Sequence, residues 1–302
     1  MTHLPEYIRH HQIDFNKWDN MINTHINGRV YNQSFFLNQF CSWDAIILGD
    51  YSAGIPLPIS KKIGVRGLLQ PNFIQQCLWV GQVPDKRTIA KIWSIIIAKF
   101  NYIQFNTNLP FDTDLTDRSN LIIPSEKIHN IESSFSKTLK KNLKKALSKH
   151  TIHPKPKPSQ TVKIYQKNYG HLAYHLKNAD YQKLLNISGN SPEYFVHIHV
   201  LHNQNLTACL MFAVGNERAH YILGAPSKIG RNLNSLTVGI YEMIQFCKEH
   251  DLTFDFEGSN IPSVRDFYAS FGSVNEPFYE VRYAPPIIRF LVDIYKKVFK
   301  SN

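Results

Sequence analysis

The predicted elements of this chain occur in the same order twice, and this repeat restricts the fold more than any other feature. Helix, β-hairpin, helix and strand follow one another between about residues 15 and 106, and again between about residues 168 and 257. The last strands of the two copies, Tyr102–Asn106 and Thr253–Glu257, alternate apolar and polar residues in the same way. The repeat predicts a tandem duplication. The fold class expected is α/β (α+β), with a mixed, mostly antiparallel sheet and flanking helices in each copy.

The boundaries of these elements come from hydrophobic periodicity and turn residues. The first copy has expected helices at about 15–25, 33–41 and 86–99 and a hairpin of Ala45–Leu48 with Ala53–Ile59. The second copy has expected helices at about 168–188 and 234–250, a strand Tyr194–Leu201 and a hairpin of Leu206–Val214 with Ala219–Gly224. Proline has no backbone N–H to donate to a neighbouring strand, so we expect a sheet edge or a β-bulge at Pro56 and Pro58.

Charge is distributed unevenly along the chain. The 302 residues are enough for two domains, and the net charge is +11. The segment Ser133–Ala179 has no acidic residue and contains eleven lysines: Lys137, Lys140, Lys141, Lys144, Lys145, Lys149, Lys155, Lys157, Lys163, Lys167 and Lys177. The other basic residues equal the acidic residues in number, so the whole excess lies in this segment. Such a concentrated positive field attracts polyanions.

A lysine-rich helix is expected to open the second domain. Ser136 is a plausible N-cap, and the lysines from 137 to 149 share one helical face. The apolar face is expected to hold Phe135, Leu139, Leu143, Ala146 and Leu147. Pro154, Pro156 and Pro158 then favour an extended linker. We therefore predict domains at 1–132 and 133–302, with a C-terminal helix at 286–300 that packs back on the first domain or lies on a membrane surface.

Other features indicate an ordinary intracellular protein. The cysteines Cys41, Cys77, Cys209 and Cys247 lie far apart and are expected to be reduced and buried. His197 and His199 share a strand face and His202 follows, but no cluster of metal ligands is evident, so we predict no metal. Because we find neither a signal peptide nor an apolar run of the ~18 residues that a span needs, we expect a cytoplasmic protein.

The stretch Phe254–Gly272 carries the reactive side chains. Asp255 and Glu257 share one face of a strand, about 7 Å apart, which suits a general base for an attacking amine. A Gly-Ser-Asn break and Pro262 then begin a helix that places Tyr268 where it could protonate a leaving group. The alternatives are that a carboxylate caps the turn or pairs with a lysine, and that Tyr268 packs in the core.

The run N-I-P-S-V-R-D-F-Y-A-S-F-G, residues 260–272, resembles the closing motif of GNAT-type acyltransferases. The resemblance implies transfer of an acyl group to an amine without a covalent enzyme intermediate, at a point where Ala219–Gly224 and Thr253–Glu257 diverge, with Tyr268 as general acid. It places the donor against Tyr221, Gly224, Ala225, Lys228, Arg231, Asn234 and Ser235. The chain departs from the motif at Ala225–Leu236, where Gly230 is the one glycine of a normally glycine-rich phosphate loop.

The duplication, this altered loop and the segment Ser136–Ala146 are similar to the FemAB-like branch of these enzymes. That resemblance implies aminoacyl-tRNA as donor, with Lys140, Lys141, Lys144 and Lys145 on its phosphates, and an amine-bearing small molecule or lipid-linked acceptor. It implies no tightly bound cofactor, because acyl-coenzyme A or aminoacyl-tRNA would enter as a substrate. Two alternatives are an ordinary acyl-coenzyme A-dependent N-acetyltransferase acting on a small amine, and a non-catalytic double-GNAT scaffold that binds polyanions.

Overall fold

The computed structural model describes residues 4–62, 65–173, 175–258 and 261–288, which form two compact units. The first unit contains the chain up to Arg118 and again from Phe278, and the second contains Ser119–Pro277. This division corrects the boundary predicted after residue 132. The reason is strand pairing: β8 (Leu121–Ile123) joins the second sheet, and β15 (Phe278–Tyr283) joins the first. Most of the C-terminal helix predicted at 286–300 lies outside the described residues.

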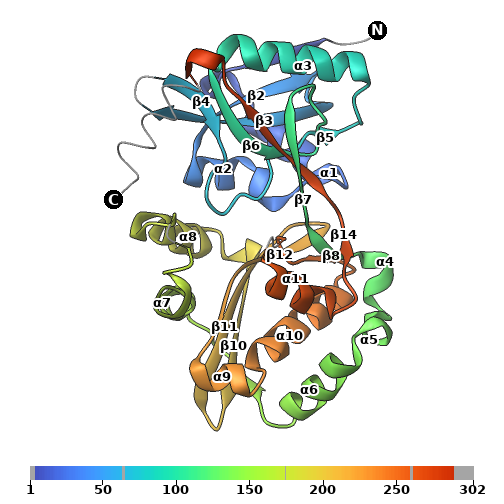
Figure 1. Cartoon of the computed structure of the whole chain (residues 1–302), viewed down its shortest axis with the longest axis vertical. Coiled ribbons are helices and arrows are strands. Elements are labelled where there is room, and N and C mark those ends of the chain that lie inside the picture. Colours follow the sequence, from blue (N-terminus) through green and yellow to red (C-terminus); the bar gives the residue numbers. More distant parts are fainter. Residues whose placement is uncertain (1–3, 63–64, 174, 259–260, 289–302) are drawn as a thin grey trace. The chain divides into compact units, whose positions relative to one another are not determined.

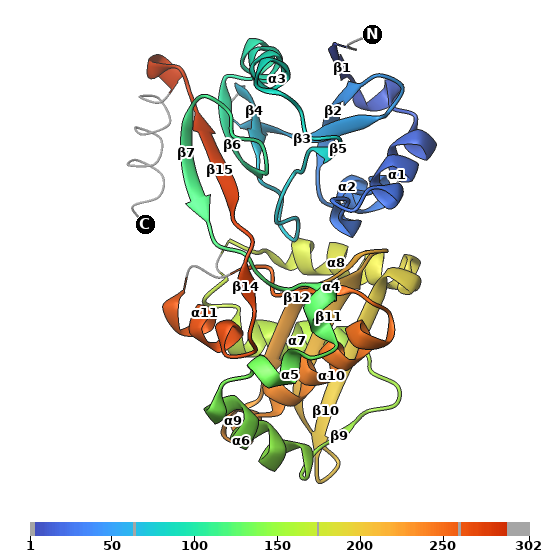
Figure 2. The same cartoon turned by 90° about the vertical axis from the view of Figure 1, so that its right-hand side faces the viewer.

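The strands of the two sheets can be matched position by position along the sheet. The first runs β1 (Pro5–Ile8), β2 (Ser42–Leu48), β3 (Ala53–Lys62), β4 (Val65–Leu69), β6 (Tyr102–Thr107), β15 and β7 (Asp114–Arg118), and β5 (Val80–Gly81) pairs with β3. The second runs β9 (Thr151–Ile152), β10 (Phe195–His202), β11 (Asn205–Val214), β12 (Arg218–Pro226), β13 (Thr253–Asp255), β8 and β14 (Val274–Asn275). Figure 2 shows β15 beside β7 in the first unit.

Pair by pair, the sheets also match in strand direction. All neighbours along the two orders are antiparallel except β4 with β6 and the corresponding β12 with β13, which are parallel. This match confirms the predicted duplication and the mixed, mostly antiparallel fold class. The expectation for Pro56 and Pro58 is also confirmed: among the described residues, 55–58 pair with β2 alone.

Helices flank each sheet. The first unit has α1 (Phe15–Thr24), α2 (Ser34–Phe40) and α3 (Lys86–Lys99). The second has α4 (Ser125–Ile128), α5 (Ile131–Ser134), α6 (Lys137–Leu147), α7 (Pro158–Tyr169), α8 (Asn178–Asn190), α9 (Lys228–Asn232), α10 (Ser235–Glu249) and α11 (Pro262–Ala269). Figure 1 shows α7 on one side of β10–β12 and α6 and α10 on the other. No helix in the described ranges combines the length and apolarity needed to cross a membrane.

The lysine-rich helix forms as predicted, with two corrections nearby. The Ser136 hydroxyl accepts a hydrogen bond from the Leu139 amide at 3.2 Å, so the N-cap is confirmed. Leu139, Leu143 and Ala146 are buried, but Leu147 is 38% exposed and does not belong to the core face. The proline-rich linker is shorter than expected, because Pro158 occupies the first position of α7, where its missing amide costs nothing. The helices predicted at about 168–188 are α7 and α8, and α7 begins at Pro158, before the predicted range.

The histidines of β10 attach the sheet to the helices that cover it. The Nε2 atom of His199 lies 3.0 Å from the Thr161 hydroxyl of α7, and that of His197 lies 2.9 Å from the Ser188 hydroxyl of α8. Burial lowers the pKa of each histidine to about 4. Three cysteines, Cys77, Cys209 and Cys247, are buried as expected, whereas Cys41 is partly exposed.

From these two buried histidines we expect the second unit to lose stability in acid. Below pH ~6.5 the unfolded chain binds protons at both histidines, whereas the folded state binds them only near pH 4. The free energy of unfolding therefore falls across that window, by on the order of 3 kcal/mol for each histidine. Denaturant unfolding of the full chain between pH 4 and 7 measures the loss. The His199→Gln variant should show a shallower dependence, and an identical slope in both proteins would contradict this account.

Candidate active site

The candidate site lies where two strands of the second unit part. The pairing of β12 with β13 begins at Arg218 with Thr253 and ends at His220 with Asp255. Strand β12 continues to Pro226, but no backbone hydrogen bond joins Tyr221–Pro226 to 256–258 within the described residues. Glu257 and Gly258 have φ angles of 61° and 72°, which turn the chain away from β12. We call this divergence the splay.

A shift in strand register on β12 lies beside the splay. In the pairing with β11, Phe212 faces Tyr221 while Met211 faces Leu223, so Ile222 is left without an opposite residue. Such a bulge changes the direction of the following backbone and side chains. The bulge and the end of β13 pairing fall at the same level of the sheet, so β12 has backbone groups there that are not committed to β13.

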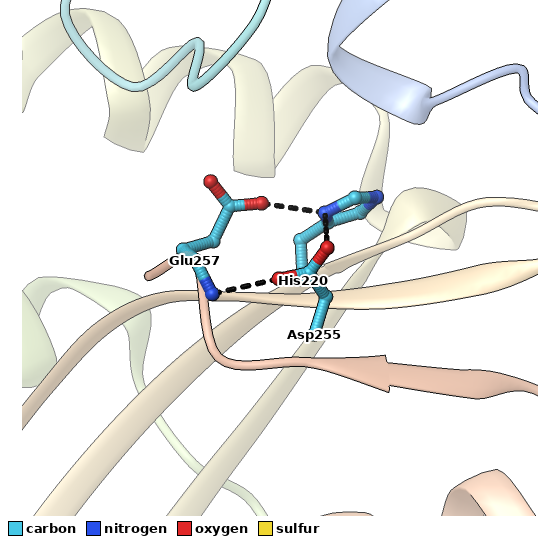
Figure 3. A group of neighbouring side chains, drawn as sticks. All are labelled: His220, Asp255 and Glu257. Carbon is cyan, nitrogen blue, oxygen red and sulfur yellow. Dashed lines mark hydrogen bonds and ion pairs between the residues drawn. The ribbon is translucent and has the colours of Figure 1, made fainter. Parts of the chain in front are cut away.

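Buried charged side chains gather at the last paired position (Figure 3). Asp255 Oδ2 lies 2.8 Å from Arg218 and accepts from the Asn120 amide at 3.1 Å, and Asp255 Oδ1 accepts from the Glu257 backbone amide at 2.8 Å. Arg218 is also 2.6 Å from Glu276. Because both its oxygens accept hydrogen bonds and its side chain is 1% exposed, Asp255 is better suited to holding the strand end than to meeting a substrate.

Glu257 differs from Asp255 in its surroundings. Its carboxylate Oε1 lies 2.5 Å from Nδ1 of His220, and its side chain is 15% exposed. Its positive φ is unusual for a residue with a side chain, and such strain persists where the surrounding contacts hold it. Of the two carboxylates that the sequence nominates, Glu257 is therefore the one placed to contact an incoming group.

Sequence reasoning missed two members of this cluster, Arg218 and His220. They alternate along β12 and therefore point to the same face as Asp255 on the neighbouring strand. Their relevance depends on the parallel register of β12 and β13, which no local pattern in the sequence encodes. The polar residues at 218 and 220, within an otherwise apolar strand, were the available signal.

Tyr268 lies on the other side of the sheet from the carboxylates. Its ring stacks on Phe256 at 4.5 Å between centroids, and Phe254 and Phe256 belong to the apolar core on the α10 side. Strand alternation then places Asp255 on the opposite face. The structure thus brings Asp255 and Glu257 together with His220, while Tyr268 borders the splay from the core side. Burial raises the pKa of the Tyr268 phenol, so the group is protonated at neutral pH.

The residues predicted to hold the donor follow the bulge. The ring of Tyr221 lies between Phe212, at 5.2 Å, and Tyr268, at 6.2 Å. Its hydroxyl covers Gly224, where an added Cβ would lie 1.7 Å from the phenol oxygen. The neighbouring Ala225 is fully buried.

The expected phosphate site contains a short helix, α9, that sequence reasoning missed. Lys228 and Arg231 lie on α9, and the Arg231 guanidinium lies over the Tyr169 ring at 5.6 Å. Asn234 adopts a left-handed conformation just before α10. The buried hydroxyl of Ser235 lies 2.8 Å from His150 Nε2, so this side chain turns into the protein.

His150 also joins this region to the lysine-rich helix. Its Nδ1 lies 2.7 Å from the Ala146 carbonyl at the end of α6, while its Nε2 contacts Ser235 at the start of α10. The lysines Lys140, Lys141, Lys144 and Lys145 are exposed along α6. The end of the lysine-rich helix therefore adjoins the beginning of the helix predicted to receive phosphates.

The contact between Tyr221 and Gly224 predicts the effect of a small substitution. In Gly224→Ala the new methyl group would overlap the phenol, and relieving that overlap is expected to cost about 1–3 kcal/mol and to displace Tyr221 from the splay. Urea unfolding of the full chain measures the loss. Gly189→Ala is the matched control, because a Cβ at Gly189 meets no atom within 4 Å. Equal stability of the two variants would show that Tyr221 lies elsewhere.

His220, Asp255 and Glu257 have ligand-type atoms within 4.8 Å of one another, so we considered a metal ion. The Arg218 guanidinium already lies 2.8 Å from the Asp255 carboxylate. A divalent cation bound by Asp255 would face that positive charge at close range. The cluster is therefore better explained as a network of ion pairs and hydrogen bonds.

The first unit provides an internal comparison. By the register of the parallel pairs, Leu69 and Gln104 correspond to His220 and Asp255, and Asn106 corresponds to Glu257. The segment after β4 fills the edge of β6: the Gln70 amide donates to the Gln104 carbonyl at 2.9 Å, and the Cys77 amide donates to the Asn106 carbonyl at 2.8 Å. At these positions the first unit therefore has no splay, and amide side chains stand in place of the Asp255 and Glu257 carboxylates.

Searches by sequence against family models and against curated proteins found no match. Solved structures do match along nearly the whole chain. FemX has 13% identity and a TM-score of 0.67, covering 97% of this chain and 99% of its own. The C-terminal domain of a lysylphosphatidylglycerol synthetase from Agrobacterium fabrum has 14% identity and a TM-score of 0.56, covering 94% and 95%.

A third match decides the architecture. A tandem GNAT protein from clavulanic acid biosynthesis has 8% identity and a TM-score of 0.50, covering 93% of this chain and 99% of its own. The chain has a tandem GNAT fold, which it shares with FemX and with that protein. Because all these identities are below 25%, the likeness concerns the fold, and the chemistry has to be argued from the site.

Proposed function

We propose that this protein transfers an acyl or aminoacyl group to an amine, and that the second unit performs the chemistry. The observation that carries the proposal is the splay beside Glu257 and His220, at a position where the first unit has a filled edge and amide side chains. The fold shared with FemX and with a lysylphosphatidylglycerol synthetase supports the same class of reaction.

In the proposed mechanism the acceptor amine attacks the carbonyl carbon of the donor ester or thioester. A new C–N bond forms, the amine proton passes to the Glu257 carboxylate, and the C–O or C–S bond of the donor then breaks. Backbone amides of β12 near the bulge would stabilise the oxyanion, and Tyr268 would protonate the leaving oxygen or sulfur. Asp255, fixed by Arg218, would hold the strand end in position.

Two donors fit this mechanism. An aminoacyl-tRNA is favoured by the exposed lysines of α6, whose end is joined through His150 to the start of α10. Acyl-coenzyme A is the alternative, and Lys228 and Arg231 could contact its phosphates. The single glycine at 230 argues against the usual loop, because a Cβ there would lie 2.0 Å from the Thr207 carbonyl, so Gly230 serves the packing of α9.

The direct test is a transfer assay with radiolabelled aminoacyl-tRNAs and acyl-coenzyme A thioesters, each offered to small amines and to amines on lipid carriers. We expect product with at least one aminoacyl-tRNA. Turnover with acyl-coenzyme A alone, indifferent to tRNA, would favour the ordinary N-acetyltransferase. Failure of every donor both to react and to bind would contradict the proposed function.

The lysine face predicts how RNA binding responds to salt. Replacing Lys140, Lys141, Lys144 and Lys145 with Gln should flatten the slope of log K against log salt by about 3 if all four contact phosphates. Fluorescence anisotropy with unacylated tRNA between 50 and 300 mM KCl, roughly the range where the effect is large, measures the slope. Lys86, Lys91, Lys99 and Lys127 provide a quadruple Gln control outside this face. An unchanged slope would remove α6 from the donor site.

The polyanion-binding scaffold remains the second candidate function. The concentration of the whole charge excess in one segment favours it independently of the splay. A scaffold would bind polyanions with a steep salt dependence that survives Glu257→Gln and Tyr268→Phe, and it would yield no product with either class of donor.

A further inference from the structure

His220 is the most deeply buried titratable side chain beside the proposed base. Its side chain is 0% exposed, and its Nδ1 lies 2.5 Å from Glu257 Oε1 and 3.8 Å from Asp255 Oδ2. A ring nitrogen and a carboxylate oxygen this close must have a proton between them. Imidazole and Glu257 carboxylate therefore behave as one hydrogen-bonded pair (Figure 3).

The charges around this pair are arranged asymmetrically. Among the described contacts, the Arg218 guanidinium pairs with the carboxylates of Asp255 and Glu276, whereas the Glu257 carboxylate contacts His220. Asn120 adds a neutral donor to Asp255. His220 therefore influences how strongly the Glu257 carboxylate attracts a further proton.

The backbone of Glu257 is also held in place by neighbouring groups. Glu257 has a φ of 61°, a strained conformation for a residue with a side chain. Asp255 Oδ1 holds its amide at 2.8 Å and His220 holds its carboxylate, so both ends of the residue are fixed. In the first unit the equivalent positions carry Leu69 and Asn106, which cannot form such a pair.

We infer that His220 is the positioning residue for Glu257, an inference that rests on the proposed function. Neutral His220 donates Nδ1–H to Oε1 and fixes the carboxylate that receives the amine proton. When His220 binds a second proton, its positive charge stabilises the Glu257 anion and weakens it as a base. Transfer should therefore decline as the pH falls and His220 becomes charged.

The test compares two variants of the full chain. His220→Asn retains a donor near the Nδ1 position but cannot titrate, whereas His220→Leu introduces the residue found at the equivalent position 69. We expect His220→Leu to lower kcat by about 100-fold, with the Asn variant recovering part of that loss and showing an acidic limb of the pH profile that is shifted, because only Glu257 then titrates. His199→Asn, a buried histidine of the same sheet, should keep the profile. Equal kcat values for the Leu variant and the parent, or an unchanged acidic limb in the Asn variant, would overturn the inference.

A second measurement requires no turnover. In the protein labelled with ¹⁵N-histidine, we expect a downfield Nδ1–H resonance that vanishes in His220→Asn and shifts in Glu257→Gln. A resonance indifferent to Glu257→Gln would refute the pair even if transfer occurs. If the resonance responds as expected and no donor reacts, the pair is established and the proposed reaction, with the positioning role that depends on it, is rejected.

Discussion

Replacing Glu257 with Gln should reduce acyl transfer by about 10²–10⁴-fold while leaving donor binding nearly unchanged. The amide keeps the size of the side chain and can still accept from His220, but it cannot take a proton from the amine. Steady-state and single-turnover rates with the donor identified in the transfer assay measure the effect, and donor Kd is measured in parallel.

Glu217→Gln is the matched control. Glu217 lies just before β12, is exposed and carries the same charge, so its replacement should leave the rate within about twofold. A Glu257→Gln variant as active as this control would remove Glu257 from the mechanism. The scaffold function would then be favoured if tRNA binding remained intact.

The Arg218→Met variant should be the most destabilising single change in the second unit, at about 3–5 kcal/mol. The Arg218 side chain is 8% exposed and that of Asp255 1%, so removing the guanidinium leaves a buried carboxylate without its positively charged partner. Denaturant unfolding of the full chain measures the change. Arg265→Met, at an exposed arginine 4.0 Å from Asp266, is the control and should cost less than ~1 kcal/mol.

A double variant separates the charge effect from lost packing. Adding Asp255→Asn to Arg218→Met removes the unpaired charge and should recover a large part of the stability. If the double variant is as unstable as the sum of the two single variants, the cost comes from packing and not from the buried carboxylate.

Local periodicity was sufficient to predict most helices and hairpins of this fold. The Ser136 cap, the lysine face of α6, Pro262 at the start of α11 and the two copies of the repeat follow from neighbouring residues. The exchange of β8 and β15 between the sheets could not be predicted, because it depends on pairings between residues more than 100 positions apart.

The site shows the same limit. Alternation along one strand correctly places Asp255 and Glu257 on one face. It cannot reveal that Asp255 forms an ion pair with Arg218 while Glu257 contacts His220. That difference follows from the parallel register of β12 and β13 and from the positive φ of Glu257. Likewise, the stacking of Tyr268 on Phe256 puts the phenol across the sheet from the carboxylates, which the spacing in the sequence does not indicate.

The central claim is that a donor carbonyl lodges where β12 and β13 diverge. Crystals of the full chain soaked with a non-hydrolysable 3′-aminoacyl adenosine amide, and separately with a coenzyme A thioether, test it most directly. The account predicts one of these carbonyl analogues beside the β12 bulge, within hydrogen-bonding reach of its backbone amides and close to Glu257. Side chains packed continuously across that position, with both analogues bound elsewhere or absent at saturating concentration, would contradict it.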